Sequence, residues 1–228
     1  MSGTKQKIFA IVIFVLVVLF GVGQFFAGAN LTPPAQNPNN PPATQVIVWA
    51  PPLPASSTPV LKGSCFASSV AAPYRADAWR CMVGNAISDP CFQVQEPVAA
   101  SNTLPIVCGA NPVGNNTSST FVIALTKPLP KQEIPSSTPS NWAWLVELGD
   151  GTVCSPFTGT RPFAKTGEVA TYSCRSGASI PTGALIFGDL NNASATWTAE
   201  VGVLSTATST FPPAMIASAT VPVFTVWQ

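Results

Sequence analysis

The longest hydrophobic stretch of the chain lies at its N-terminus and does not alternate with polar residues. Residues 8–20 contain no polar side chain, and the apolar run continues to about Ala29. A helix needs about 20 such residues to cross a bilayer. Two lysines precede the run and the next basic residue is Lys62, a distribution that leaves the N-terminus in the cytoplasm. We therefore predict a transmembrane anchor over residues 1–29, with residues 8–29 in the membrane.

A cleaved signal peptide is the alternative interpretation of the same run. The tripeptide Ala27-Gly28-Ala29 has the small-x-small pattern of a signal peptidase site. On this interpretation the protein is secreted after cleavage near Ala29. On the first interpretation it crosses the cell membrane once, and on both the rest of the chain lies outside the cytoplasm.

Prolines recur through residues 30–60, and each one lacks an amide donor and fixes its own φ. We predict that this segment is a stalk between the membrane and a folded domain. One pentapeptide within it, Val46-Ile47-Val48-Trp49-Ala50, is apolar and β-prone instead. It is predicted to be an edge strand packed on the domain, and the alternative is a docking segment for a neighbouring protein.

Alternation with a period of two predicts strands in the second half of the chain. The clearest example joins Trp142, Trp144, Val146 and Leu148, which alternate with Ala143, Leu145 and Glu147. Further strands are predicted at residues 169–174, 184–187 and 196–204, with turns at Asp150-Gly151 and at residues 189–192. Only residues 74–83 suit a helix. Pro73 stands at its start, and proline is tolerated in the first turn of a helix.

These patterns predict a mainly β fold with one short helix, a β-rich α+β domain over residues 61–228. A second proline-rich stretch, residues 127–140, is a possible internal break. Residues 221–227 close the chain with apolar side chains and include Pro222. We predict a closing edge strand there, because proline lacks the donor that a central strand needs. The alternative is an unpaired tail that adds a strand to another protein's sheet.

All of the cysteines lie beyond the N-terminal run: Cys65, Cys81, Cys91, Cys108, Cys154 and Cys174. An even number in an extracytoplasmic chain predicts disulfides that brace the domain, although spacing alone permits many pairings. We prefer pairs of neighbours in the sequence: Cys154 with Cys174, Cys65 with Cys81, and Cys91 with Cys108. No pair has the spacing of a zinc knuckle or of a Cys-x-x-Cys redox motif, so no metal, cofactor or redox site is predicted.

Charge and histidine content narrow the function classes. Charged residues make up 8% of the chain without basic clusters, so nucleic acid is not a predicted partner. Histidine is absent, which excludes most familiar serine and cysteine hydrolase triads. Carboxylates are available for a glycosidase pair, but no arrangement singles out two of them. Asp89-Pro90 and Asp150-Gly151 are interpreted as turn formers that bond their own backbone, so no catalytic residue is predicted.

Two groups of residues are candidates for binding. In the predicted helix, Asp77 and Arg80 are spaced to pair, while Tyr74, Arg75 and Asp77 offer a possible recognition patch. The second group is Trp142 and Trp144, whose alternation places them on one face. Burial in the core is the main interpretation of these tryptophans, and an exposed platform for sugar rings or protein partners is the alternative.

Short motifs around the cysteines resemble a group of poorly characterised bacterial envelope modules, secreted or membrane-tethered. The motifs are Gly63-Ser64-Cys65, Asp77-Ala78-Trp79-Arg80-Cys81 and Asp89-Pro90-Cys91-Phe92, followed by Asp150-Gly151-Thr152-Val153-Cys154, Tyr172-Ser173-Cys174 and Trp197-Thr198. The resemblance spans residues 63–203 and implies a non-catalytic, extracytoplasmic accessory domain. It brings no ligand or reaction with it.

The sequence therefore predicts a membrane-anchored protein without enzymatic activity that has a structural or protein-binding role in the cell envelope. Its predicted partner is an envelope protein or complex, and it contacts the membrane through residues 8–29. The first alternative is a module that binds a cell-wall glycan or another polysaccharide through its tryptophans. The second is a carbohydrate hydrolase that works without histidine.

Overall fold

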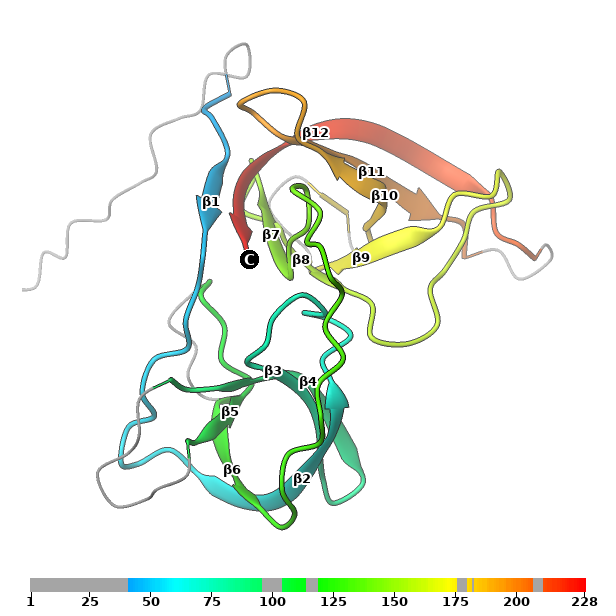
Figure 1. The fold of residues 1–228 in the computed structure, drawn as a ribbon. Helices are drawn as coiled ribbons and strands as arrows, with labels where there is room; N and C mark the ends of the chain where they lie inside the picture. The colour runs from blue at the N-terminus through cyan, green and yellow to red at the C-terminus, as the bar shows by residue number, and fades with distance from the viewer. Residues whose placement is uncertain (1–40, 96–103, 114–118, 176–179, 182, 207–210) are drawn as a thin grey trace, which may run out of the picture. The chain divides into compact units, whose positions relative to one another are not determined.

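The computed structural model describes residues 41–95, 104–113, 119–175, 180–181, 183–206 and 211–228, which form twelve strands and no α-helix (Figure 1). Residues 38–228 make up one compact unit. The described part of the chain contains no helix that is long and apolar enough to span a membrane. The predicted anchor, residues 1–29, lies outside the described residues.

The first half of the domain is a closed barrel of five strands: β2 (Val60–Ser68), β3 (Ala78–Val83), β4 (Ala86–Gln93), β5 (Ile106–Cys108) and β6 (Phe121–Leu125). Neighbouring strands are antiparallel except β2 and β6, whose parallel pairing closes the ring. Its interior holds Trp79, Ile106 and Ile123 together with two disulfides. The barrel therefore has a core of its own.

The predicted helix over residues 74–83 is wrong. Tyr74 lies in a turn, and the chain is extended as β3 from Ala78. The β3 strand pairs with β2 on one side and β4 on the other, which places Cys81 directly opposite Cys65. Those long-range contacts satisfy the backbone and decide the conformation over the local helical pattern.

The second half is a barrel-like sheet in which the strands follow one another: β7 (Leu145–Leu148), β8 (Val153–Pro156), β9 (Ala170–Cys174), β10 (Leu185–Asn191), β11 (Thr198–Leu204) and β12 (Met215–Trp227). The predicted strands cover these places except β8 and the start of β12. The predicted turn at Asp150-Gly151 is confirmed, because the Asp150 carboxylate accepts a hydrogen bond from the Thr152 amide and Gly151 has a positive φ of 82°. The predicted turn at residues 189–192 is wrong, since β10 continues to Asn191.

The β12 strand is central in the sheet, so the prediction of a closing edge strand is wrong. Its first part pairs with β11 as far as Pro222, and its second part pairs with β7 from Val223. The proline thus stands where the strand changes partners, a position at which its missing donor costs no regular ladder bond. Because β12 pairs with both β11 and β7, it joins the first and last strands of this series and closes the sheet.

The prediction of an edge strand before the domain is confirmed by β1 (Gln45–Ile47), which pairs in parallel with residues 225–227 of β12. Thr44 fixes its start, because its hydroxyl donates to the Val223 carbonyl and accepts from the Trp197 amide. From residue 41 onward the predicted stalk is therefore attached to the domain. Its residues 30–40 lie outside the described part of the chain.

The possible break at residues 127–140 falls between the two β-structures, since β6 ends before it and β7 begins after it. This connection follows the surface of the first barrel. The Gln132 side chain donates to the Ala78 carbonyl, and the Glu133 amide donates to the Ser68 hydroxyl.

All three preferred cysteine pairs are confirmed: Cys65–Cys81, Cys91–Cys108 and Cys154–Cys174. Each disulfide joins residues that stand directly opposite each other on neighbouring antiparallel strands. The covalent links therefore fix strand register at one point in β2–β3, one in β4–β5 and one in β8–β9.

Replacing the second-half disulfide by the double substitution Cys154→Ala and Cys174→Ala tests its contribution to stability. The bond closes a loop with a sequence separation of 20 residues. We expect the free energy of unfolding to fall by about 3 kcal/mol, because the unfolded chain gains loop-closure entropy. Urea denaturation of the full chain under oxidising conditions measures the change. A loss of stability below about 1 kcal/mol would contradict the assignment. So would a non-reduced peptide map of the unmodified chain that links Cys154 to a cysteine other than Cys174.

Candidate functional site

Arg75 lies in the turn between β2 and β3 and reaches the ends of two strands of the other sheet. One of its Nη1 hydrogen bonds goes to the Trp49 carbonyl at 2.5 Å and another to the Gln228 carbonyl at 3.1 Å. Its Nε and Nη2 atoms bind both carboxylate oxygens of Asp77, at 2.8 and 2.6 Å. This is a bidentate, charge-assisted pair of two largely buried side chains. The guanidinium thus ties the first barrel to residues that follow β1 and β12.

Aromatic side chains surround this contact. The guanidinium carbon lies 4.6 Å from the centre of the Phe92 ring, within cation–π distance. Phe92, Trp49 and Trp144 pack pairwise with ring centroids 5.1–5.3 Å apart. We call these three rings, with Arg75 and Asp77, the junction cluster. It belongs to a hydrophobic core that contains residues of both β-structures.

The sequence-predicted binding residues divide into two places. Arg75, Asp77 and Trp144 are in the junction cluster, where Trp144 is 4% exposed, so core burial of this tryptophan is confirmed. Tyr74 and Trp142 are half-buried and line a cavity. The predicted pair of Asp77 and Arg80 does not form, since Asp77 binds Arg75 and the Arg80 side chain lies 3.8 Å from Asp89.

The cavity has a volume of about 230 Å³ and forms where the turn between β2 and β3 meets the second sheet. Tyr74 and Trp142 pack edge to face there, with ring centroids 5.3 Å apart and an interplanar angle of 70°. The second half of the domain contributes polar side chains from strands, Tyr172 of β9 and Asp189 of β10, and from connecting segments, Asn141 and Arg161. None of these four residues was predicted to bind a ligand, because they are far apart in the chain and no short motif joins them.

Tyr172 forms part of the buried wall of this cavity. Its hydroxyl donates a hydrogen bond of 2.8 Å to the Ala143 carbonyl. Burial raises the pKa of Tyr172 to about 12, and the nearby charges of Asp189 and Arg161 act on it in opposite directions. The phenol is therefore protonated at neutral pH and holds the segment before β7 against β9.

Asp89 fixes the turn that supplies the opposite wall. Its carboxylate accepts hydrogen bonds from the Ser69 hydroxyl and from the amides of Val70 and Ala71. Burial raises the pKa of Asp89 above its ordinary value, although these hydrogen bonds and Arg80 lower it. The interpretation of Asp89 as a turn former that bonds its own backbone is wrong, because it bonds a different turn, 18–20 residues earlier.

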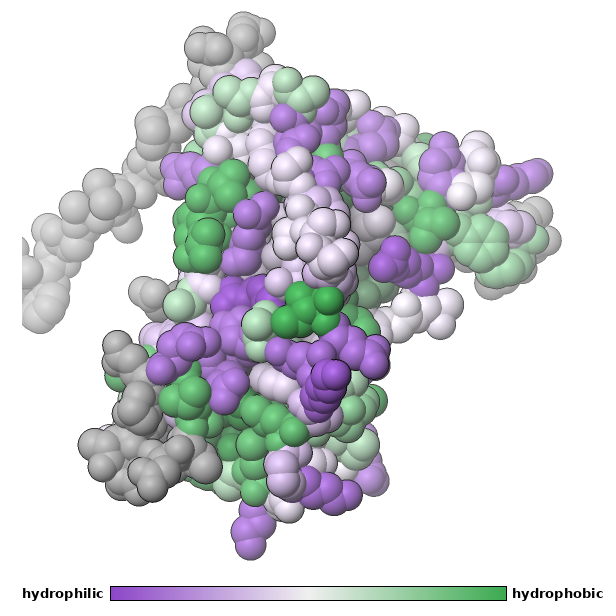
Figure 2. Space-filling view, in the orientation of Figure 1, coloured by the Kyte–Doolittle hydropathy of each residue, from purple (hydrophilic) through white to green (hydrophobic). Residues whose placement is uncertain are grey.

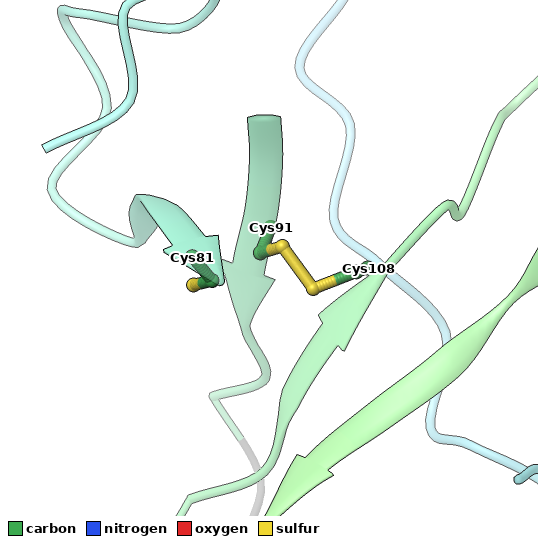
Figure 3. Close-up of side chains that lie close together, drawn as sticks. All are labelled: Cys81, Cys91 and Cys108. Carbon is green, nitrogen blue, oxygen red and sulfur yellow. A yellow bond between two sulfur atoms is a disulfide. The ribbon is translucent and has the colours of Figure 1, made fainter. Parts of the chain in front are cut away.

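Three sulfur atoms meet in the first barrel (Figure 3). Those of Cys81, Cys91 and Cys108 lie within 4.8 Å of one another. Cys91 and Cys108 form one disulfide, and Cys81 is bonded to Cys65. Because metal ions bind thiolates, this sulfur cluster offers no ligand in its oxidised form.

The chain was compared with protein-family models, curated proteins and solved structures, and none of them matches.

Replacing Arg75 by glutamine is expected to lower the free energy of unfolding by about 3 kcal/mol, because Asp77 and two partly buried carbonyls lose their donor. Urea denaturation of the full chain measures this. The matched control is Arg175→Gln, an exposed arginine outside the junction cluster, for which we expect a change within about 0.5 kcal/mol. Equal effects of the two substitutions would show that Arg75 does not hold the junction.

Proposed function

We propose that the protein is a membrane-anchored, extracytoplasmic protein without enzymatic activity that binds another envelope protein by strand addition to β1. The N-terminal apolar run supports the anchor, and the disulfides support an oxidising compartment outside the cytoplasm. The proposal for the partner depends on one observation, which is the apolar outer edge of β1.

Hydrogen bonding shows which backbone groups of β1 are used within the protein. The Ile47 carbonyl accepts from the Gln228 amide, and the Trp49 amide donates to the Gln228 carbonyl. Successive residues of a strand direct their backbone groups to opposite sides, so those of Val46 and Val48 face away from β12. Among the described residues, no strand pairs with this outer side.

The side chains along the same edge are hydrophobic and accessible. Val46 is 48% exposed and Val48 is 85% exposed. Figure 2 shows the corresponding hydrophobic surface over β1. Edge strands of soluble proteins are commonly protected by charged residues or proline, and residues 45–49 contain neither. An uncharged, extended segment of a partner fits such an edge, because it supplies both backbone hydrogen bonds and apolar contacts.

A photo-crosslinking amino acid at position 48, placed in the full chain in its native membrane, tests this proposal. We expect cross-links to one extended segment of a single partner, identified by peptide mapping. The substitution Val46→Pro removes an amide that faces away from β12, so it leaves the β1–β12 ladder intact. It should reduce the cross-linked yield about tenfold, because the partner strand loses one backbone hydrogen bond and meets a proline ring at that position.

The matched control is Val46→Thr, which keeps the amide and nearly the same shape, and it should retain most of the cross-linking. The proposal would be abandoned if the solubilised protein ran as a lone monomer and position 48 captured nothing. Equal yields from Val46→Pro and the unmodified chain would also count against strand addition.

A further inference from the structure

The cavity beside Tyr74 and Trp142 has polar groups that the protein itself does not use. Both Arg161 and Asp189 are exposed and act electrostatically on Tyr172, and no side-chain hydrogen bond or ion pair joins either of them to another described residue. The Asn141 amide nitrogen donates to the Leu190 carbonyl, which leaves its amide oxygen as an acceptor. The Tyr172 hydroxyl donates its proton to Ala143 and keeps its own acceptor capacity.

The cavity therefore offers both hydrogen-bond acceptors and hydrogen-bond donors. The Asp189 carboxylate, the Asn141 amide oxygen and the Tyr172 hydroxyl can all accept a hydrogen bond, while Arg161 supplies donors. A matching ligand must therefore carry both donors and acceptors of its own. Hydroxyl groups of a sugar meet this requirement, since each can donate and accept at the same time.

The aromatic pair supplies the apolar part of the recognition. Tyr74 and Trp142 are half-buried and stand at 70° to each other, so they form two walls of one corner. Aromatic faces pack well against the C–H groups of a sugar ring, while the polar tips of the two side chains stay available for hydrogen bonds. Trp144, in contrast, is buried in the junction cluster and offers no such face.

We propose that this cavity binds one saccharide ring of a cell-surface polysaccharide, stacked on Tyr74 and Trp142 and hydrogen-bonded to Asp189, Asn141 and Arg161. The volume of about 230 Å³ is below the range of pockets for drug-sized ligands, which suits a single ring. A small zwitterion such as an amino acid fits less well. Arg161 and Asp189 are both exposed, and exposed ion pairs contribute little to binding. This inference does not depend on strand addition at β1.

The experiment uses the full chain in phospholipid nanodiscs, because detergents with sugar headgroups would compete. The tryptophans are labelled with 5-fluorotryptophan, and the Trp142 fluorine resonance is assigned from its disappearance in Trp142→Phe. Glucose, galactose, mannose, N-acetylglucosamine and glucuronate are titrated separately, with glycine as the zwitterionic comparison. We expect at least one saccharide to shift the Trp142 resonance saturably with a millimolar dissociation constant, while the Trp144 resonance stays unchanged.

Two matched substitutions locate the site without disturbing the core. Asp189→Asn should weaken saccharide binding about tenfold, because a charge-assisted hydrogen bond is replaced by a weaker neutral one. Glu133→Gln removes a carboxylate from an exposed position that does not line the cavity, and it should leave binding unchanged. The inference is overturned if none of the saccharides shifts Trp142, if glycine alone does so, or if the two substitutions have the same effect.

Discussion

A largely buried guanidinium requires fixed acceptors for most of its five N–H donors, because it stays charged and leaving water is costly. Arg75 obtains these acceptors from Asp77 within its own turn and from the carbonyls of Trp49 and Gln228, which follow β1 and β12. The same side chain covers the face of Phe92. The turn that carries Arg75 also carries Tyr74, so the contact that joins the two β-structures also places one wall of the cavity.

The two β-structures reach stability in different ways. The first barrel is small, and two disulfides occupy much of its core together with Trp79 and Ile106. The second relies on β12, whose two halves pair with β11 and β7 and whose last residues also pair with β1. As a result, the segment that precedes the domain and the segment that ends it are hydrogen-bonded side by side. The apolar edge of β1 thus rests on a central strand rather than on a loop, so it is preorganised for the strand addition proposed above.

Local patterns in the sequence predicted much of the sheet and little of the site. Alternation predicted strands through Val146, Tyr172 and Ile186, and neighbouring spacing predicted all three disulfides, because both signals act over short distances. The helix prediction for residues 74–83 failed because β3 pairs with β2 and β4, and the local helical pattern carries no information on strand pairing. The tail was mistaken for an edge strand because a partner exchange at Pro222 has no sequence signal. Arg161 and Asp189 were not predicted to line a cavity, because they are distant from Trp142 in the sequence and only folding brings them beside it.

Native-state hydrogen exchange at the junction tests most directly whether Arg75 makes the two β-structures one cooperative unit. The informative amides are those of Trp49 and Gln228, which bond across β1 and β12, and that of Trp144, which bonds to the Trp227 carbonyl. They should exchange with the same free energy as the amides of Ile106 and Ile186 in the two cores, through global unfolding only. Exchange at the junction about a hundredfold faster than in both cores would show that the contact opens by itself, and it would contradict this account.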